Sequence, residues 1–252
     1  MSERSSKFFG LLVFVMLITG FTYLMITGSN VSHNEVYNRI ILIGNKILPA
    51  KEYLRYSGLT DSTEYKNLTL LDVQNQIEKH PYLRKAEVEF DGINTILVEV
   101  KEKEIKAVLL QKNQLKLLTS DLKTLPLFPP TTISELPVIS NISMNRKMTF
   151  SPEELEFAFR IIDAISLTDT LVRKNLAEIN LRQGGDAILT FTGLQFPVLF
   201  GKSDEIRKAL ILKNMWTQLS DETNPYERTE YLDLRYKNKV FIGKNKIELA
   251  SR

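Results

Sequence analysis

The pattern of hydrophobic and polar positions divides this chain into an uncharged start and a long remainder of mixed character. The start is a run of 19 uncharged residues, Phe8 to Ile26. At about 1.5 Å per residue, a helix of this length spans the roughly 30 Å hydrocarbon core of a bilayer. Arg4 and Lys7 precede the run, so the positive-inside rule keeps the N-terminus in the cytoplasm. The pattern predicts a cytoplasmic tail (1–7), a transmembrane helix (8–26) and a polar stalk (27–38).

A cleaved signal peptide is the alternative interpretation of this run. The apolar core of a signal peptide usually covers about 7 to 15 residues and ends at a small-x-small site. Here the run is longer, and its exit, Thr27-Gly28-Ser29-Asn30, is a poor cleavage site. We therefore expect a retained anchor in the cytoplasmic (inner) membrane, in contact with lipid through residues 8–26, and the bulk of the chain in the periplasm or another extracytoplasmic space.

Residues 39–104 show the pattern of a compact α+β module. A β-branched run at 40–43 stops at Gly44-Asn45, which is typical of a buried strand before a turn. Helical spacing follows at 49–57 and at 70–79. Apolar residues then alternate with polar ones on both sides of the turn at 91–94, which predicts a hairpin of strands 86–90 and 96–100. The predicted order is β-α-α-β-β.

Residues 105–243 predict a second, mixed α/β domain, a curved antiparallel sheet packed on helices, before a tail of residues 244–252. Ser151-Pro152-Glu153-Glu154 predicts a helix start with a capping box, and the apolar stripe after it should lie on a sheet. A proline-broken loop is expected at 125–130. In the helix at 203–219, Ile206 and Leu210 are placed on the buried side. The expected strands are 107–111, 115–119, 179–181, 187–192, 196–200, 231–236 and 239–242.

Composition excludes several classes of function. The chain is 43% hydrophobic and 25% charged, and a net charge of +3 is too small at this length to indicate a nucleic-acid surface. The absence of cysteine excludes disulfides, thiol nucleophiles and cysteine-ligated metals.

Candidate chemistry is sparse. His33 and His80 are isolated, whereas metal sites need three or four ligands with local spacing. Glu87, Glu89 and Asp91 share one strand face but lack the opposed carboxylate that a hydrolase uses, so a solvated face is expected. No phosphate-binding loop, dinucleotide motif or nucleophile elbow occurs. We expect no catalytic residue, no metal and no cofactor.

Several motifs resemble one family. They are Gly44-Asn45, Pro81-Tyr82, Ala86-x-Val88, Val98-x-Val100-x-Glu102-Lys103, Leu136-Pro137-x-Ile139 and Tyr231-x-Asp233-Leu234-Arg235-Tyr236. Together with the β-α-α-β-β order they resemble the FtsQ/DivIB family of bacterial cell-division proteins, single-pass membrane proteins with a POTRA domain. Ile105 stands where the family usually has a proline.

The resemblance implies a non-enzymatic scaffold at the division septum that helps control septal peptidoglycan synthesis. It implies that the C-terminal strands bind FtsB/FtsL-like membrane coiled-coil proteins and that the POTRA domain contacts other division proteins. The residues carried over from the family motif are Tyr231, Asp233, Leu234, Arg235 and Tyr236, with Lys239 and Phe241 added by adjacency.

Strand addition is the expected means of binding. Residues 231, 233 and 235 point to one side and residues 232, 234 and 236 to the other, so the segment can be buried on one face only. At a sheet edge its backbone could pair with another chain, and Arg235 could bind a partner's carboxylate. On an interior strand, Arg235 and Asp233 would instead pair with each other or with solvent.

Two other functions remain open. A POTRA chaperone of outer-membrane or secreted proteins would use the same strand pairing, but it normally carries several POTRA repeats or a β-barrel. A membrane-anchored envelope hydrolase would need a nucleophile or a metal site.

Overall fold

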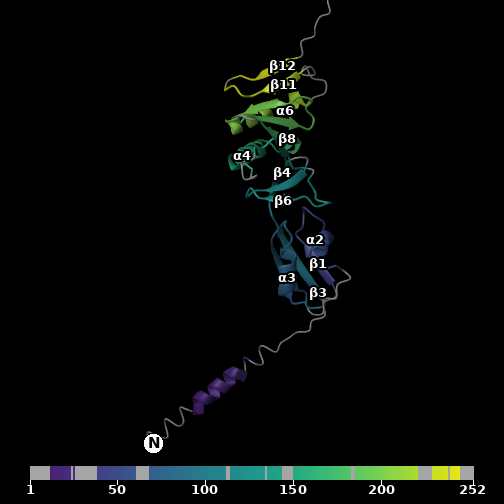
Figure 1. Ribbon diagram of the computed structural model, residues 1–252, viewed down its shortest axis with the longest axis vertical. Helices are drawn as coiled ribbons and strands as arrows, with labels where there is room; N and C mark the ends of the chain where they lie inside the picture. Colours follow the sequence, from purple (N-terminus) through teal and green to yellow (C-terminus); the bar gives the residue numbers. More distant parts are fainter. Residues whose placement is uncertain are drawn as a thin grey trace, which may run out of the picture.

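A computed structural model describes residues 12–23, 25, 39–60, 68–111, 114–133, 135–143, 150–182, 185–220, 229–237 and 239–244. Within these residues the chain builds two β-sheets, each with helices of its own. The small sheet precedes the large sheet, and the two follow each other along the long axis in Figure 1. The fold class is α+β, as predicted.

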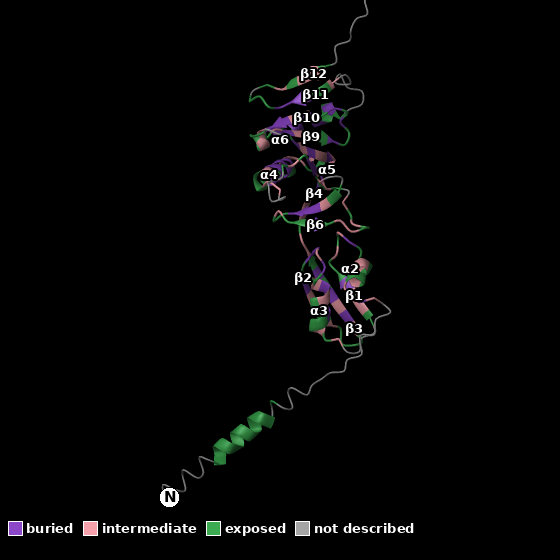
Figure 2. Cartoon of the chain, viewed as in Figure 1, coloured by how far each residue is buried: buried purple, intermediate pink, exposed green. Residues whose placement is uncertain are grey.

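The N-terminal apolar run is helical where it is described. Residues 12–23 form a helix whose side chains are all exposed (Figure 2). No helix within the described residues is long and apolar enough to cross a bilayer. Residues 8–11, 24 and 26 of the predicted span lie outside the described residues, as do the predicted tail 1–7, the stalk 27–38 and residues 245–252.

The small sheet confirms the predicted β-α-α-β-β order. Among the described residues it has three strands in the order β1–β3–β2, with β1 parallel and β2 antiparallel to β3. One face packs on the two helices, where Val73 and Ile77 are fully buried against Val98 and Ala86. The elements are β1 (Arg39–Ile43), α2 (Ala50–Tyr56), α3 (Leu70–Glu78), β2 (Leu83–Phe90) and β3 (Thr95–Glu102).

The carboxylate of Glu102 joins the end of β3 to the turn that follows β1. It accepts hydrogen bonds from the backbone N–H groups of Lys46 (2.9 Å) and Ile47 (3.1 Å) and from the hydroxyl of Tyr53 (2.6 Å). Burial and the hydrogen bond to Glu102 raise the pKa of Tyr53 far above its usual range. Because the donors lie 49 to 56 residues away in sequence, this one side chain holds distant parts of the module together.

The large sheet runs, among the described residues, in the order β12–β11–β10–β9–β8–β7–β4–β5–β6. Its strands are β4 (Ile105–Gln111), β5 (Gln114–Thr119), β6 (Thr124–Pro126), β7 (Val138–Ser140), β8 (Leu176–Leu181), β9 (Ala187–Phe191), β10 (Val198–Gly201), β11 (Thr229–Asp233) and β12 (Phe241–Lys244). β6 overlaps the start of the segment 125–130, for which the sequence predicts a loop.

The expectation of an antiparallel large sheet is wrong. The pairs β4–β7, β7–β8 and β10–β11 are parallel, so the sheet is mixed. The physical reason lies in the connections, because parallel neighbours need a crossover long enough to return the chain to the same end of the sheet. Helices α4 (Pro152–Thr168) and α5 (Thr170–Asn175) make this crossover between β7 and β8, and α6 (Glu205–Leu219) makes it between β10 and β11.

Two details of these helices differ from the prediction. Ser151 caps α4 by accepting from the backbone N–H of Glu154, but Glu154 returns no bond to Ser151 and instead accepts from the N–H of Ser143. On α6, Ile206 and Leu210 are 62% and 46% exposed, because the sheet covers the face that carries Leu212 and Trp216. The capping box is therefore incomplete, and the buried stripe of α6 is narrower than the sequence indicates.

The two cores meet at strands β4 and β5. Val108 and Leu117 pack with the core of the small sheet, whereas Ala107 and Leu118 pack with the core under α4. Both faces are thus buried at residues 107–109 of β4 and 117–119 of β5, which follows from the alternation of side chains along a strand. The boundary predicted between residues 104 and 105 stays a prediction.

Candidate functional site

The C-terminal end of the large sheet holds the residues selected from the sequence. β11 is an interior strand, paired with β10 in parallel and with β12 antiparallel. Among the described residues, β12 pairs only with β11 and is the last strand of the sheet. The unpaired backbone edge therefore belongs to β12, and residues 229–233 lie one strand inside it (Figure 1).

The two faces of this hairpin have different surroundings. Leu232 and Leu234 are fully buried in the core beneath the sheet, and Ile242 packs against the same core. On the opposite face Tyr231 is 38% and Phe241 45% exposed. Leu234 thus contributes packing rather than accessible surface, whereas the outer face presents aromatic rings beside a free edge.

Asp233 and Arg235 form a bidentate ion pair. The guanidinium donates from Nε to Oδ1 (2.9 Å) and from Nη2 to Oδ2 (2.7 Å), and the backbone N–H of Arg235 donates to Oδ1 (3.0 Å). These hydrogen bonds lower the pKa of Asp233 and raise that of Arg235. This arrangement is the one that the sequence allowed for an interior strand, in which Asp233 and Arg235 pair with each other.

Arg235 also reaches a neighbouring turn. Its Nη1 lies 3.6 Å from Oδ2 of Asp186, which precedes β9. Beneath it, Lys208 is almost fully buried with its ammonium 5.1 Å from the ring of Phe200, and desolvation lowers its pKa. The Arg235 side chain remains 43% exposed, so its guanidinium has partners on the protein side and an open side toward solvent.

The outer face next to the edge is aromatic. The rings of Tyr236 and Phe241 meet edge to face with centroids 4.8 Å apart, and Tyr236 is 52% exposed. The ring of Tyr231 lies over its cross-strand partner Gly243, where a Cβ atom would overlap it. Exposed aromatic rings beside an open backbone edge are typical of surfaces that bind extended peptides. Lys239 is exposed in the connection between the two strands.

The histidine considered as a metal ligand in the POTRA region has a structural role instead. His80 is buried among the rings of Tyr53, Tyr56 and Tyr82, and desolvation lowers its pKa to about 4. Among the described residues, no three His, Cys, Asp or Glu side chains are grouped closely enough to hold a metal ion. His33 lies outside the described residues.

Comparison with known proteins agrees with the β-α-α-β-β order of the small sheet and its helices. Residues 37–103 match the FtsQ-type POTRA domain, a range that covers β1 through β3. Over 209 residues the chain is 26% identical to the cell division protein FtsQ of Geotalea daltonii, which covers 79% of this chain and 72% of that protein. The chain is a distant homologue of FtsQ.

The small sheet and its two helices form an FtsQ-type POTRA domain. The resemblance identified from the sequence is confirmed. Sequence reasoning did not find Asp186, Gly201 or Gly243, which touch Arg235 or Tyr231. The pairing of β11 with β12 and β10 brings these residues together, and the sequence carried no local signal for it.

Proposed function

We propose that this chain is a non-enzymatic cell-division scaffold anchored in the cytoplasmic membrane, and that its β12 edge binds FtsB/FtsL-like membrane coiled-coil proteins by strand addition. The observation that carries the proposal is the edge of β12, which no other described strand covers, next to exposed Tyr236 and Phe241 in a distant homologue of FtsQ. An added strand satisfies the backbone groups of the edge, and the rings provide apolar area at low entropic cost.

The anchor is part of the proposal. Residues 8–26 are uncharged, and every side chain of residues 12–23 is exposed, so no other part of the chain that the structure describes covers this part of the helix. A lipid environment suits such a helix. The extracytoplasmic modules would then lie near the septum, where the scaffold helps control peptidoglycan synthesis by other proteins.

The partner-binding residues have separate roles in this proposal. Tyr231, Tyr236 and Phe241 supply apolar contact, and the open side of the Arg235 guanidinium meets a carboxylate of the partner. Asp233 and Leu234 hold the strand in position from inside the protein. Lys239 contributes charge at the rim, where single charges contribute little to affinity.

A binding assay tests the edge with a matched control. Tyr236→Ala in the full-length chain, purified in detergent, should weaken binding to a co-expressed FtsB/FtsL-like pair at least about tenfold, as expected for an aromatic anchor. Tyr56→Ala removes a tyrosine of similar exposure, 50%, from the POTRA domain and should leave the affinity unchanged. Equal affinity of wild type and Tyr236→Ala would contradict the assignment of the interface.

Depletion in the native cell tests the wider function. Loss of the protein should produce filaments without lysis if it supports septation. Defects in outer-membrane assembly would instead favour the chaperone alternative, and cell-wall hydrolysis by the purified chain would favour the hydrolase.

A further inference from the structure

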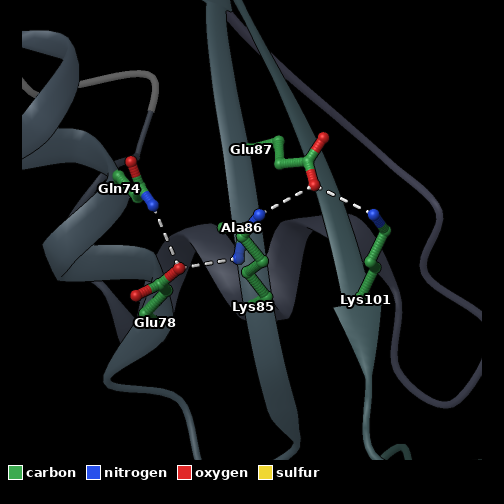
Figure 3. Close-up of polar contacts among 6 residues, drawn as sticks. All are labelled: Gln74, Glu78, Lys85, Ala86, Glu87 and Lys101. Atoms are coloured by element: carbon green, nitrogen blue, oxygen red, sulfur yellow. Dashed lines mark hydrogen bonds and ion pairs between the residues drawn. The ribbon is translucent and has the colours of Figure 1, made fainter.

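The two edges of the POTRA sheet are not equivalent. On the β2 side, Oε1 of Glu78 accepts from the backbone N–H of Ala86 (2.9 Å) and from Nε2 of Gln74 (3.2 Å) (Figure 3). Helix α3 packs along β2 and aims this carboxylate at the outer edge of the strand. A segment that paired with β2 would have to displace a charge-assisted hydrogen bond, so this edge is protected.

The opposite edge, β1, has no such protection from any residue that the structure describes. Among the described residues β1 pairs only with β3, from Arg39↔Thr95 to Ile43↔Glu99. Leu42 is buried and Ile40 packs on the core beneath the helices. By the alternation of a strand, Arg39, Ile41 and Ile43 face away from the helices. Ile43 is 42% exposed, which leaves an apolar row beside an open backbone edge.

Charges mark the two ends of this row. Glu99 lies opposite Ile43 and forms no ion pair within the described residues. The nearby lysines 85 and 101 both bind Glu87 (Figure 3), and Lys101 also attracts Glu99 electrostatically without contacting it. At the other end Arg39 is exposed and likewise without an ion pair among the described residues. The edge therefore presents a positive end, an apolar centre at Ile41 beside Leu97, and a negative end.

We propose that the β1 edge of the POTRA domain is a second docking site, which takes an extended segment of a partner protein by strand addition. The charge pattern specifies the segment. The partner segment should carry three side chains at alternate positions that face this row. An acidic side chain would lie opposite Arg39, an apolar one opposite Ile41, and a basic one opposite Ile43, within reach of Glu99. This site is separate from the β12 edge, and it does not depend on what β12 binds.

Designed peptides test the site on the full-length chain in detergent. The probes are two fluorescein-labelled peptides with the cores Glu-Thr-Val-Thr-Lys and Lys-Thr-Val-Thr-Glu, one for each strand direction, and fluorescence anisotropy measures binding. One of the two peptides should bind. A Lys-Thr-Val-Thr-Lys peptide should bind at least about fivefold more weakly, because it places a lysine opposite Arg39 and the two positive charges repel each other. Binding should also slow hydrogen exchange in β1.

Substitutions then locate the bound peptide. Ile43→Lys and Glu99→Lys should each weaken binding at least about tenfold, since a lysine at an edge discourages pairing and the second change reverses the charge. Leu71→Lys places the same charge on an exposed apolar position of α3 and should have no effect. If Ile43→Lys shifts the urea midpoint, the exposed Glu99→Lys decides the test.

Three results would overturn the proposal. They are the absence of binding by both peptides, equal binding to wild type and Glu99→Lys, and loss of binding in Phe241→Lys with retention in Glu99→Lys, which would place the peptide at β12. The FtsB/FtsL-like assay is independent, because Glu99→Lys should leave that affinity unchanged.

Discussion

The POTRA domain and the C-terminal edge of the large sheet both contain a glycine with positive φ, but the two glycines face different neighbours. Gly44 (φ +86°) lies against the backbone of β3, and a Cβ there would be 2.5 Å from the carbonyl oxygen of Val100. At Gly201 (φ +76°) the nearest atom to a Cβ is Cγ of Arg235, at 2.8 Å. The backbone at Gly44 cannot give way, whereas at Gly201 the Arg235 side chain can turn away at the expense of its ion pair with Asp233.

The same contrast holds for two carboxylates. Glu102 binds groups that lie 49 to 56 residues away, whereas Asp233 binds Arg235, two residues away. In the POTRA domain a single side chain therefore fixes distant parts of the fold. At the C-terminal end of the large sheet the Asp233–Arg235 pair is local, and the longer-range contact of Arg235, with Asp186, is a looser one at 3.6 Å. Rearranging these contacts should cost less of the fold, which suits a surface that has to adapt to a second chain.

The largest effect in this comparison is expected at the glycines. Gly44→Ala should destabilise the protein by about 4 kcal/mol, the sum of a left-handed backbone and a clash with backbone. Gly201→Ala should cost less, about 2 to 3 kcal/mol, because the left-handed backbone is strained and the base of the Arg235 side chain has to shift, which weakens its ion pair with Asp233. Equilibrium urea unfolding of both variants measures the difference. Equal losses would show that the C-terminal edge is as rigid as the POTRA domain.

A smaller effect is expected when the long-range carboxylate is removed. Glu102→Ala should cost about 3 kcal/mol, because it leaves two backbone N–H groups and the Tyr53 hydroxyl without their acceptor. Hydrogen exchange at the amides of Lys46 and Ile47 should accelerate in parallel. Glu104→Ala, at an exposed position two residues on, is the matched control and should change stability by less than about 0.5 kcal/mol. A similar loss in both variants would contradict the role of Glu102.

The smallest effect is expected at Asp233. Asp233→Asn should cost about 1 kcal/mol at pH 7, since it weakens a charge-assisted pair whose arginine still reaches water. The pKa of Asp233 is lowered in the folded state, mainly by the hydrogen bonds from Arg235. Its stabilisation is therefore complete above the unfolded pKa of about 3.9 and is lost as the pH falls through the lower folded value.

Urea unfolding of wild type and Asp233→Asn between pH 7 and pH 2.5 measures this dependence. The difference in stability should be constant down to about pH 5 and should shrink below about pH 4. A difference that stays constant to pH 2.5 would mean that the charge of Asp233 contributes nothing to the folded state.

Much of the local structure could be predicted from the sequence because local rules specify it. Alternation at Ala86, Val88 and Phe90 indicated a strand, Ser151-Pro152 marked the first turn of α4, and Gly44-Asn45 ended β1 where expected. The motif at residues 231–236 lies at the C-terminal end of the large sheet, and its role in binding stays a prediction.

The sequence by itself determined the α+β class, the β-α-α-β-β module and the helices α2, α3, α4 and α6, because each follows from the spacing of side chains along the chain. It predicted strands at 231–236 and 239–242, whereas β11 covers 229–233 and β12 covers 241–244. Only the tertiary structure decided which strands are parallel, that β12 rather than β11 is the open edge, and that Arg235 binds Asp186. The physical reason is that strand pairing joins segments far apart in sequence, and a strand that will lie inside a sheet has the same local pattern as one that will lie at its edge.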